Sequence, residues 1–222
     1  MKKNLLPWQL LTLVLLVLPT VYLLYAWLQL PEQVPTHFGT DGTPNGFTSR
    51  ANIWLITSAL PVGLAALLTA LPLLDPKRRF DTSTVNFQKL RLALVALTSA
   101  VACYSLYTAL HPGAGNGRAL LVGVGLFFAL LGNYLGTVQP NYFVGIRTPW
   151  TLESPTVWAR THRVGGRLFF VSGLLMAGLA LVLPLAWMQP LVLTLVLGTA
   201  GFCYAYSYLA FRREERFREP AN

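Results

Sequence analysis

The most constraining feature of this chain is a series of six long apolar runs that contain no Asp, Glu, Lys or Arg. A helix needs about 20 consecutive apolar residues to cross the hydrocarbon core of a bilayer. The runs are Leu5–Leu28, Ile53–Leu74, Leu92–Leu110, Ala119–Leu135, Leu168–Trp187 and Leu191–Phe211. Only 11% of the residues are charged, whereas soluble domains carry about 25%. The sequence therefore predicts an all-α integral membrane protein, a helical bundle of six transmembrane helices.

The positions of the basic residues predict the orientation of this bundle. With the N-terminus inside, the outer connections hold only Arg50 and Arg118, and the other Lys and Arg residues fall on the inner side. Such an excess of inner positive charge is typical of membrane proteins, so both termini are predicted to be cytoplasmic. The basic residues that set this orientation account for most of the net charge of +9. Since no inner segment is long enough to fold a basic face, we predict no direct nucleic-acid partner.

The connections divide the chain into three predicted regions. Residues 1–74 form the first two spans and an extracytoplasmic loop at 30–50. Residues 75–91 form a basic cytoplasmic loop, and residues 92–222 form a four-span region with a cytoplasmic motif loop at 137–167. Cys103 and Cys203 lie inside predicted spans, which is typical of apolar core residues rather than of a disulfide or metal site.

The outer loop, LPEQVPTHFGTDGTPNGFTSR, is rich in turn-forming residues. Its prolines and its Asp41-Gly42 and Asn45-Gly46 pairs predict a compact loop with turns at those pairs. His37 and Phe38 either pack against the span ends or contact a ligand. His37, Asp41 and His111 are all predicted on the outer side, but their spacing matches no metal pattern. We therefore predict no metal and no cofactor.

The motif loop leads into a helix that is predicted to begin at Ser154-Pro155, since Ser caps helices and Pro suits their first position. On this helix Arg160, Arg163 and Arg167 share one face. These cations fit either attraction to anionic inner-leaflet lipids or a specific anionic partner. Trp158 is predicted to face away from them, in the interfacial belt that Trp prefers.

Three further features surround the fourth span. Gly132 and Gly136 are predicted to share a helix face and to let a neighbouring backbone approach. Asn133 is expected to face protein, in a hydrogen bond between helices or in contact with a ligand. Arg147 lies among apolar residues, which predicts a fixed partner: Glu153, carbonyls at a helix C-terminus or an anionic lipid headgroup.

Catalytic patterns are missing from the sequence. It contains no Ser-His-Asp, HExxH or paired-carboxylate spacing, so we predict no catalytic residues and no enzyme activity. No acidic residue lies inside any predicted span. Ion-coupled transport usually relies on such buried acids, which disfavours a coupled transporter.

The two loops together resemble the SdpI family of bacterial membrane proteins. The inner pattern runs from Gly132-Asn133 to Gly166 and includes Pro140-Asn141-Tyr142, Gly145–Leu152, Val157-Trp158 and Thr161-His162-Arg163. The outer loop resembles a short module of unknown function often found ahead of it, through Leu30-Pro31, Val34–Phe38 and Asn45-Gly46-Phe47. The resemblance covers about a quarter of the chain.

This resemblance implies a multi-pass protein of the bacterial cell membrane (the inner, cytoplasmic membrane) that gives immunity to a secreted, membrane-active peptide toxin of the SdpC type. It also implies signalling, by holding a cytoplasmic repressor at the membrane. Two other hypotheses stay open. One is a transporter or exporter of a small amphiphile or lipid, whose path would gather Thr98, Ser99, Tyr104, Asn133 and Ser207. The other is a lipid-binding protein or membrane-bound enzyme that uses His162 and Arg147.

The resemblance and the topology together give a set of candidate binding residues, with a toxin peptide expected outside and a repressor or anionic lipid inside. In the outer loop these are Pro35, His37, Phe38, Asn45 and Gly46. In the cytoplasmic loop and its flanks they are Asn133, Asn141, Tyr142, Gly145, Arg147, Thr148, Pro149, Trp150, Trp158, Thr161, His162, Arg163 and Gly166.

Overall fold

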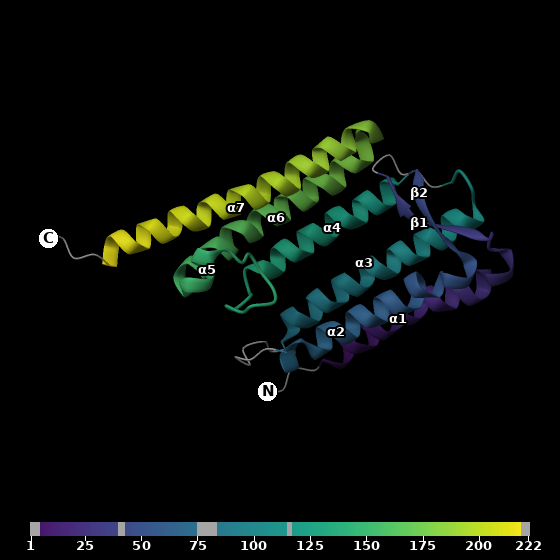
Figure 1. Cartoon of the computed structure of the whole chain (residues 1–222), viewed down its shortest axis with the longest axis horizontal. Coiled ribbons are helices and arrows are strands. Elements are labelled where there is room, and N and C mark those ends of the chain that lie inside the picture. The colour runs from purple at the N-terminus through teal and green to yellow at the C-terminus, as the bar shows by residue number, and fades with distance from the viewer. Residues whose placement is uncertain (1–4, 40–42, 75–83, 115–116, 219–222) are drawn as a thin grey trace.

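The computed structural model describes residues 5–39, 43–74, 84–114 and 117–218 (Figure 1). The α-helices are α1 (Leu6–Ala26), α2 (Leu60–Leu74), α3 (Val85–Leu110), α4 (Arg118–Leu135), α5 (Pro149–Glu153), α6 (Pro155–Val182) and α7 (Met188–Arg218). The strands are β1 (Gln33–Phe38) and β2 (Pro44–Ser49). Single 3-10 turns lie at Trp27–Gln29, Arg50–Asn52 and Leu185–Trp187, and a π-helical turn at Leu55–Ala59 leads into α2.

Six helices are long and apolar enough to cross a membrane, which confirms the predicted helical bundle. The helix predicted from Ser154-Pro155 is also confirmed, because the Ser154 side chain accepts a hydrogen bond from the Val157 amide and α6 continues through the fifth span. That span ends at Val182, earlier than predicted, since Pro184 follows.

The predicted basic loop at 75–91 is shorter than expected. Thr84 caps α3 by accepting a hydrogen bond from the Phe87 amide, so residues 85–91 are helical rather than loop. Residues 75–83 of that loop lie outside the described residues.

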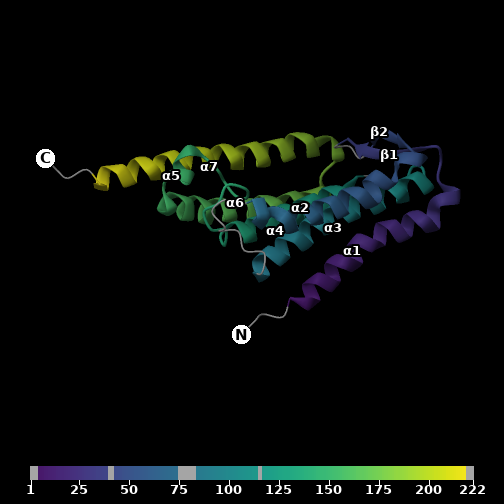
Figure 2. The same cartoon turned by 60° about the horizontal axis from the view of Figure 1, so that its bottom comes forward.

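The described helices run along one long direction, and their connections gather at two ends (Figure 1). One end, which we call the hairpin end, carries β1 and β2. The other, the motif end, carries residues 137–154, which include α5. We call these residues the motif segment. α3 contacts α1 and α2 on one side and α4 on the other, and α6 lies between α4 and α7. In Figure 2, α1 diverges from α2 and α3 toward its N-terminus.

Glycine makes the contact between α4 and α6 close. A Cβ added at Gly132 would collide with the backbone of Gly166 and Phe170, and one added at Gly125 would lie 2.6 Å from the Ala177 nitrogen. The close approach predicted at Gly132 is therefore confirmed. Gly136 behaves differently: its own Cβ would meet nothing within 4 Å, so the contact does not require glycine there. α4 ends at Leu135, and the Gly136 nitrogen would lie 3.4 Å from a Cβ added at Gly166.

The hairpin end is a folded β-hairpin. β1 and β2 are antiparallel, with Val34 opposite Thr48 and His37 opposite Gly46. Val34 is fully buried among Leu23, Leu30, Ile53 and Leu106, which fixes the hairpin to α1 and α3. The other residues of this cluster are Ala26 and Ala109.

The predicted turn at Asn45-Gly46 is wrong, because both residues lie within β2. The other predicted turn pair, at 41–42, lies outside the described residues, and so does the Asp41 side chain. Gly46 suits its place in the strand because a Cβ there would lie 2.8 Å from the Cβ of His37.

The two arginines of the hairpin end bind backbone carbonyls at helix ends. Arg118 donates from Nη1 to the carbonyls of Ala180 (2.6 Å) and Leu183 (3.0 Å). The Ala180 carbonyl needs a donor because its helical partner would be Pro184, which has no N–H. Arg50 donates to the Leu30 carbonyl at 3.1 Å. These contacts give both cations a local structural role.

Candidate functional sites at the two ends of the bundle

The motif segment is organised by the Asn141 side chain, which is 7% exposed. Its Oδ1 accepts hydrogen bonds from the amides of Phe143 and Val144. Its Nδ2 donates to the carbonyls of Gln139 and Val144. One amide side chain thus supplies four hydrogen bonds to a turn that has no regular secondary structure, which explains an Asn at this position.

His162 of α6 joins the motif segment to the helix bundle. Its Nε2 accepts a hydrogen bond from the Ile146 amide at 2.9 Å, and its Nδ1 lies 2.9 Å from the Trp158 carbonyl. A ring that accepts at Nε2 and donates at Nδ1 is a neutral imidazole with its proton on Nδ1. The His162 ring also stacks on Trp158, with centroids 4.0 Å apart. His162 is 1% exposed.

Gly145 allows this arrangement. Its φ is +128°, and a Cβ there would collide with Nε2 of His162 and lie 3.1 Å from the Trp158 ring. Only glycine adopts this backbone without strain and leaves room for both rings. Trp158 itself is buried and donates from Nε1 to the Val138 carbonyl at 2.8 Å. The predicted position of Trp158 in an interfacial belt is wrong, while its predicted separation from the exposed Arg160 and Arg163 is confirmed.

Thr148 connects the motif segment to α7. Thr148 and Thr151 cap α5 reciprocally, each hydroxyl accepting from the other residue's amide. The Thr148 hydroxyl also donates to Oγ of Ser207 at 3.0 Å. Trp150 packs against Tyr204 and Tyr208 of α7, with ring centroids 5.0 Å and 5.1 Å away. These contacts hold α5 on the side of α7.

Arg147 is exposed, and its Nη1 donates to the Tyr142 carbonyl of its own segment. This backbone carbonyl differs from each partner expected from the sequence. The motif segment therefore bends back on itself between Tyr142 and Arg147, leaving the Arg147 side chain at the surface of the motif end.

The structure separates the predicted motif-end residues into two groups. The buried or half-buried group comprises Asn141, Gly145, Thr148, Trp150, Trp158, Thr161, His162 and Gly166. The exposed group comprises Asn133, Tyr142, Arg147, Pro149 and Arg163. Asn133 faces a small cleft between α3 and α4 and makes no hydrogen bond to a described residue, so the expected bond between helices is not found there and the ligand contact stays a prediction.

The motif segment also touches the first half of the chain. Phe143 and Val144 pack against a cluster of Leu68 and Leu71 from α2 and Phe87 from α3. The same segment is bonded to α6 through His162 and to α7 through Thr148. It therefore connects the helices on both sides of the α3–α4 contact.

At the hairpin end, a cleft of about 370 Å³ lies between the hairpin and the end of α3. Of the predicted outer residues, only Pro35 lines it, together with Pro44, Phe47, Thr108 and Pro112. His37 is exposed, and its Nδ1 is bonded to Oδ1 of Asn45. Phe38 packs against Tyr104 at 5.0 Å between centroids, so the expected packing holds for Phe38 and not for His37.

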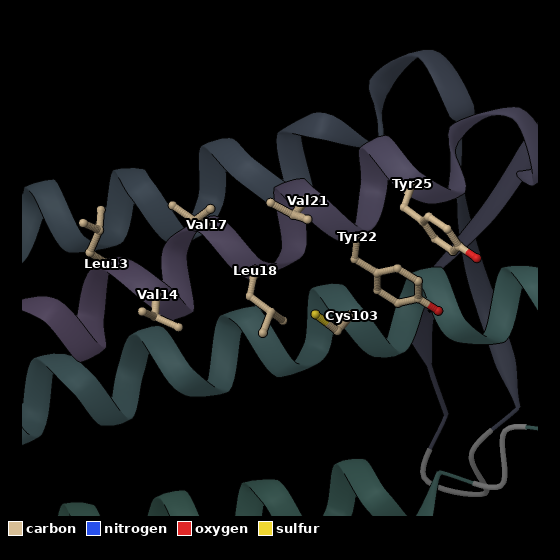
Figure 3. A pocket seen from close by; sticks show the side chains of 8 residues that line it. All are labelled: Leu13, Val14, Val17, Leu18, Val21, Tyr22, Tyr25 and Cys103. Carbon is tan, nitrogen blue, oxygen red and sulfur yellow. The ribbon is translucent and has the colours of Figure 1, made fainter.

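A lateral groove runs along α1 where it faces α3 (Figure 3). Its walls are apolar, from Leu13 and Val17 to Cys103, and the hydroxyls of Tyr22 and Tyr25 lie at one end. In a membrane, this surface suits lipid acyl chains.

Sequence reasoning missed several partners of the motif segment. Ser207, Tyr204 and Glu214 lie on α7, where Glu214 Oε2 accepts from the Ser154 hydroxyl at 2.6 Å. Thr108 of the hairpin-end cleft was also missed. Nothing in the local sequence around these residues connects them with loops 50 or more positions away.

Comparison with known proteins gives the same two regions. Residues 137–207 match the model of the SdpI/YfhL protein family, and residues 14–60 match a domain of unknown function (DUF1648). The chain is 37% identical to the immunity protein SdpI of Bacillus subtilis (strain 168) over 59 residues, which is 27% of this chain. It is 38% identical to an uncharacterized protein of Archaeoglobus fulgidus over 58 residues, 26% of this chain. These matches span 28% and 32% of the two relatives, and no solved structure matches.

The fold defines a multi-pass helical membrane protein with a folded segment at each end of its bundle. The family match begins at the motif segment and ends within α7, so it contains the network around His162, Thr148 and Ser207. Over residues 137–207, this membrane protein is similar to the SdpI family.

Proposed function

We propose that this protein gives its cell immunity to a membrane-active peptide toxin of the SdpC class and contacts a cytoplasmic partner through its motif end. The similarity to the immunity protein SdpI carries the proposal. It also rests on the orientation predicted from the basic residues, with the hairpin end outside.

The hairpin-end cleft is proposed as the toxin contact. Pro35, Pro44 and Pro112 line it, and proline backbones lose little conformational freedom on binding. Phe47 is 57% exposed at this cleft and offers an aromatic surface to an apolar side chain. At about 370 Å³ the cleft suits part of a peptide rather than a whole one.

The motif end is proposed as the cytoplasmic contact. Arg147, Tyr142 and Pro149 of the motif segment are exposed, and so is Arg163 of α6. Arginine binds carboxylates and phosphates well because its guanidinium donates two parallel hydrogen bonds. An acidic surface of a repressor or an anionic lipid headgroup would therefore fit this group.

Communication between the ends would need an element with two arrangements. The motif segment is suited to this role because Phe143 and Val144 contact α2 and α3, while Thr148 contacts α7. A displacement of α3 by a ligand at the hairpin end would change the surface on which Phe143 rests. The Gly165-Gly166 pair is close-packed against Ile146 and the Gly132 carbonyl, so packing accounts for it.

Survival of toxin-sensitive cells that express the full chain tests the outer contact. Cells are challenged with an SdpC-type peptide, and protein abundance in the membrane is measured in parallel. We expect wild-type protection, and loss of protection in Phe47→Ala. Phe170→Ala is the matched control, because Phe170 is an exposed aromatic on α6, away from the cleft. Equal survival of both variants at equal abundance would reject the cleft as the toxin contact.

The inner contact has its own test. Arg147→Ala should abolish signalling to the cytoplasmic partner without loss of membrane insertion. Arg160→Ala, which removes another exposed cation of the motif end, is the control. The readout is the fraction of the repressor recovered with membranes after toxin exposure. If the membranes of Arg147→Ala cells retained as much repressor as wild-type membranes, Arg147 would not be part of the proposed contact.

The transport hypothesis gains no support from the described polar side chains. Ser99 donates to the Leu15 carbonyl, Thr98 bonds carbonyls of its own helix, and Tyr104 accepts from the Gly117 amide. Ser207 is bonded to Thr148. These side chains lie at separate places instead of around one described path.

A further inference from the structure

A second groove lies on the other side of α1, where α1 faces α2. It encloses about 690 Å³ and is mostly apolar, with Leu13 and Leu16 on α1 and Ala66 and Ala70 on α2. The small alanines of α2 leave its floor open. Unlike the groove of Figure 3, it contains a charged residue, Arg91 of α3.

Arg91 has no counter-charge in the part of the chain that the structure describes. Its side chain is half-buried, and its Nε is buried without a hydrogen-bond partner. A guanidinium in an apolar wall is unfavourable unless it is paired with an anion. No described acidic side chain lines the groove.

The other polar groups of the groove do not provide that charge. The hydroxyl of Thr12 donates to the Trp8 carbonyl at 2.8 Å, and that of Thr69 to the Ala65 carbonyl at 2.7 Å. Both threonines therefore satisfy their own helices. The remaining polar side chain, Gln9, is neutral and exposed. Among the described residues, no group of the groove therefore balances the charge of Arg91.

We infer that this groove binds one anionic phospholipid, with its phosphate on Arg91 and an acyl chain along Leu13, Leu16 and Ala66. The ligand must combine an anion with a long apolar body, and a phospholipid has both. Arg91 is the seventh residue of α3, so it lies about 9 Å along the helix from its start. A long arginine side chain reaches from such a depth toward the headgroup region.

Native mass spectrometry of the full chain in detergent tests this inference. The protein is titrated with phosphatidylglycerol and with phosphatidylcholine of identical acyl chains. One pairing of a cation with an anionic headgroup gives a preference of about fivefold for phosphatidylglycerol. We expect Arg91→Gln to bind both lipids equally and Arg91→Lys to keep most of the preference.

Two further variants separate the groove from general attraction to basic residues. Lys89→Gln removes the same charge two residues away, on a side chain that lies over Trp8 and does not line this groove. It should keep the preference. Ala66→Phe fills the groove and leaves Arg91, so it should lose the bound phospholipid.

Three results would overturn the inference. One is an unchanged preference in Arg91→Gln, which would mean that Arg91 pairs within the protein. Another is an equal loss in Lys89→Gln, which would mean attraction to the basic surface as a whole. A third is a dimer that excludes phosphatidylglycerol, which would make a second copy the occupant.

Discussion

The hydroxyl of Ser99 on α3 donates a hydrogen bond to the carbonyl of Leu15 on α1, at 2.8 Å. Within α1 that carbonyl would pair with the amide four residues on, but residue 19 is proline and has no N–H. A serine on one span thus satisfies the backbone group that a proline leaves open on another. This contact fixes α1 against α3 at mid-span.

Ser99→Ala should therefore lower the free energy of unfolding by about 1 kcal/mol, because it leaves the part-buried Leu15 carbonyl without a donor. Pro19→Ala restores the missing N–H, so Ser99→Ala should cost clearly less in that background. Unfolding in mixed micelles measures both. Thr98→Val is the control, since the Thr98 hydroxyl returns to carbonyls of its own helix. An equal cost of Ser99→Ala in both backgrounds would contradict the role given to Pro19.

The contact between α4 and α6 predicts opposite effects for two glycines of one helix. A Cβ at Gly173 would collide with the Ala129 nitrogen, so Gly173→Ala should destabilise the protein by about 1–3 kcal/mol. A Cβ at Gly178 would meet nothing within 4 Å, so Gly178→Ala should stabilise the helix by up to about 1 kcal/mol. Chemical unfolding of both variants measures the difference. If Gly178→Ala lowered the stability, Gly178 would not face open space as the structure has it.

His162 and His111 form a matched pair. Each stacks on the aromatic residue four positions earlier, Trp158 or Tyr107, and each places Nδ1 near that residue's carbonyl. Only His162 is buried and accepts a backbone amide at Nε2. His162→Phe should cost about 1–3 kcal/mol by leaving the Ile146 amide unpaired, while His111→Phe should change stability little.

Thermal unfolding followed by near-ultraviolet circular dichroism measures the stability of both variants. Nitrogen NMR of the His162 ring adds a direct check, with the proton expected on Nδ1. A proton on Nε2 would be incompatible with the hydrogen bond from Ile146.

Arg118→Gln should destabilise the hairpin end by about 2 kcal/mol, because the carbonyls of Ala180 and Leu183 lose a charged donor. Hydrogen exchange resolves the effect, which should concentrate at the end of α6. Arg167 is an exposed cation in the first half of α6, so Arg167→Gln should leave the hydrogen exchange at the end of α6 unchanged. If Arg118→Gln changed hydrogen exchange equally along α6, the capping role of Arg118 would be rejected.

The sequence predicted the helices well because a span is a local property. Composition over about 20 residues decides it, and a serine before a proline marks the start of α6. The lengths of α3 and α6 were less predictable. Their first turns are polar, so hydropathy assigned residues 85–91 to a loop although Thr84 caps a helix there.

The sequence predicted which residues belong to the sites but not what each residue contacts. Asn141, Gly145 and His162 belong to one network, but its geometry depends on a positive φ and on partners distant in sequence. The close approach at Gly132 was predicted, but nothing local shows that Asn133 lines a cleft without a hydrogen bond to a described residue. In the hairpin, Asn45-Gly46 forms strand rather than turn, with Gly46 opposite His37 of the other strand.

Both proposed contacts depend on which end of the bundle faces outward, and cysteine accessibility measures this directly. In a background with Cys103 and Cys203 replaced by alanine, Gln33→Cys marks the hairpin end and Gln139→Cys marks the motif end. Both glutamines are exposed, so the two variants are matched. We predict that a membrane-impermeant maleimide labels Gln33→Cys in intact cells and labels Gln139→Cys only after permeabilisation. Labelling of Gln139→Cys alone in intact cells would contradict both proposed contacts.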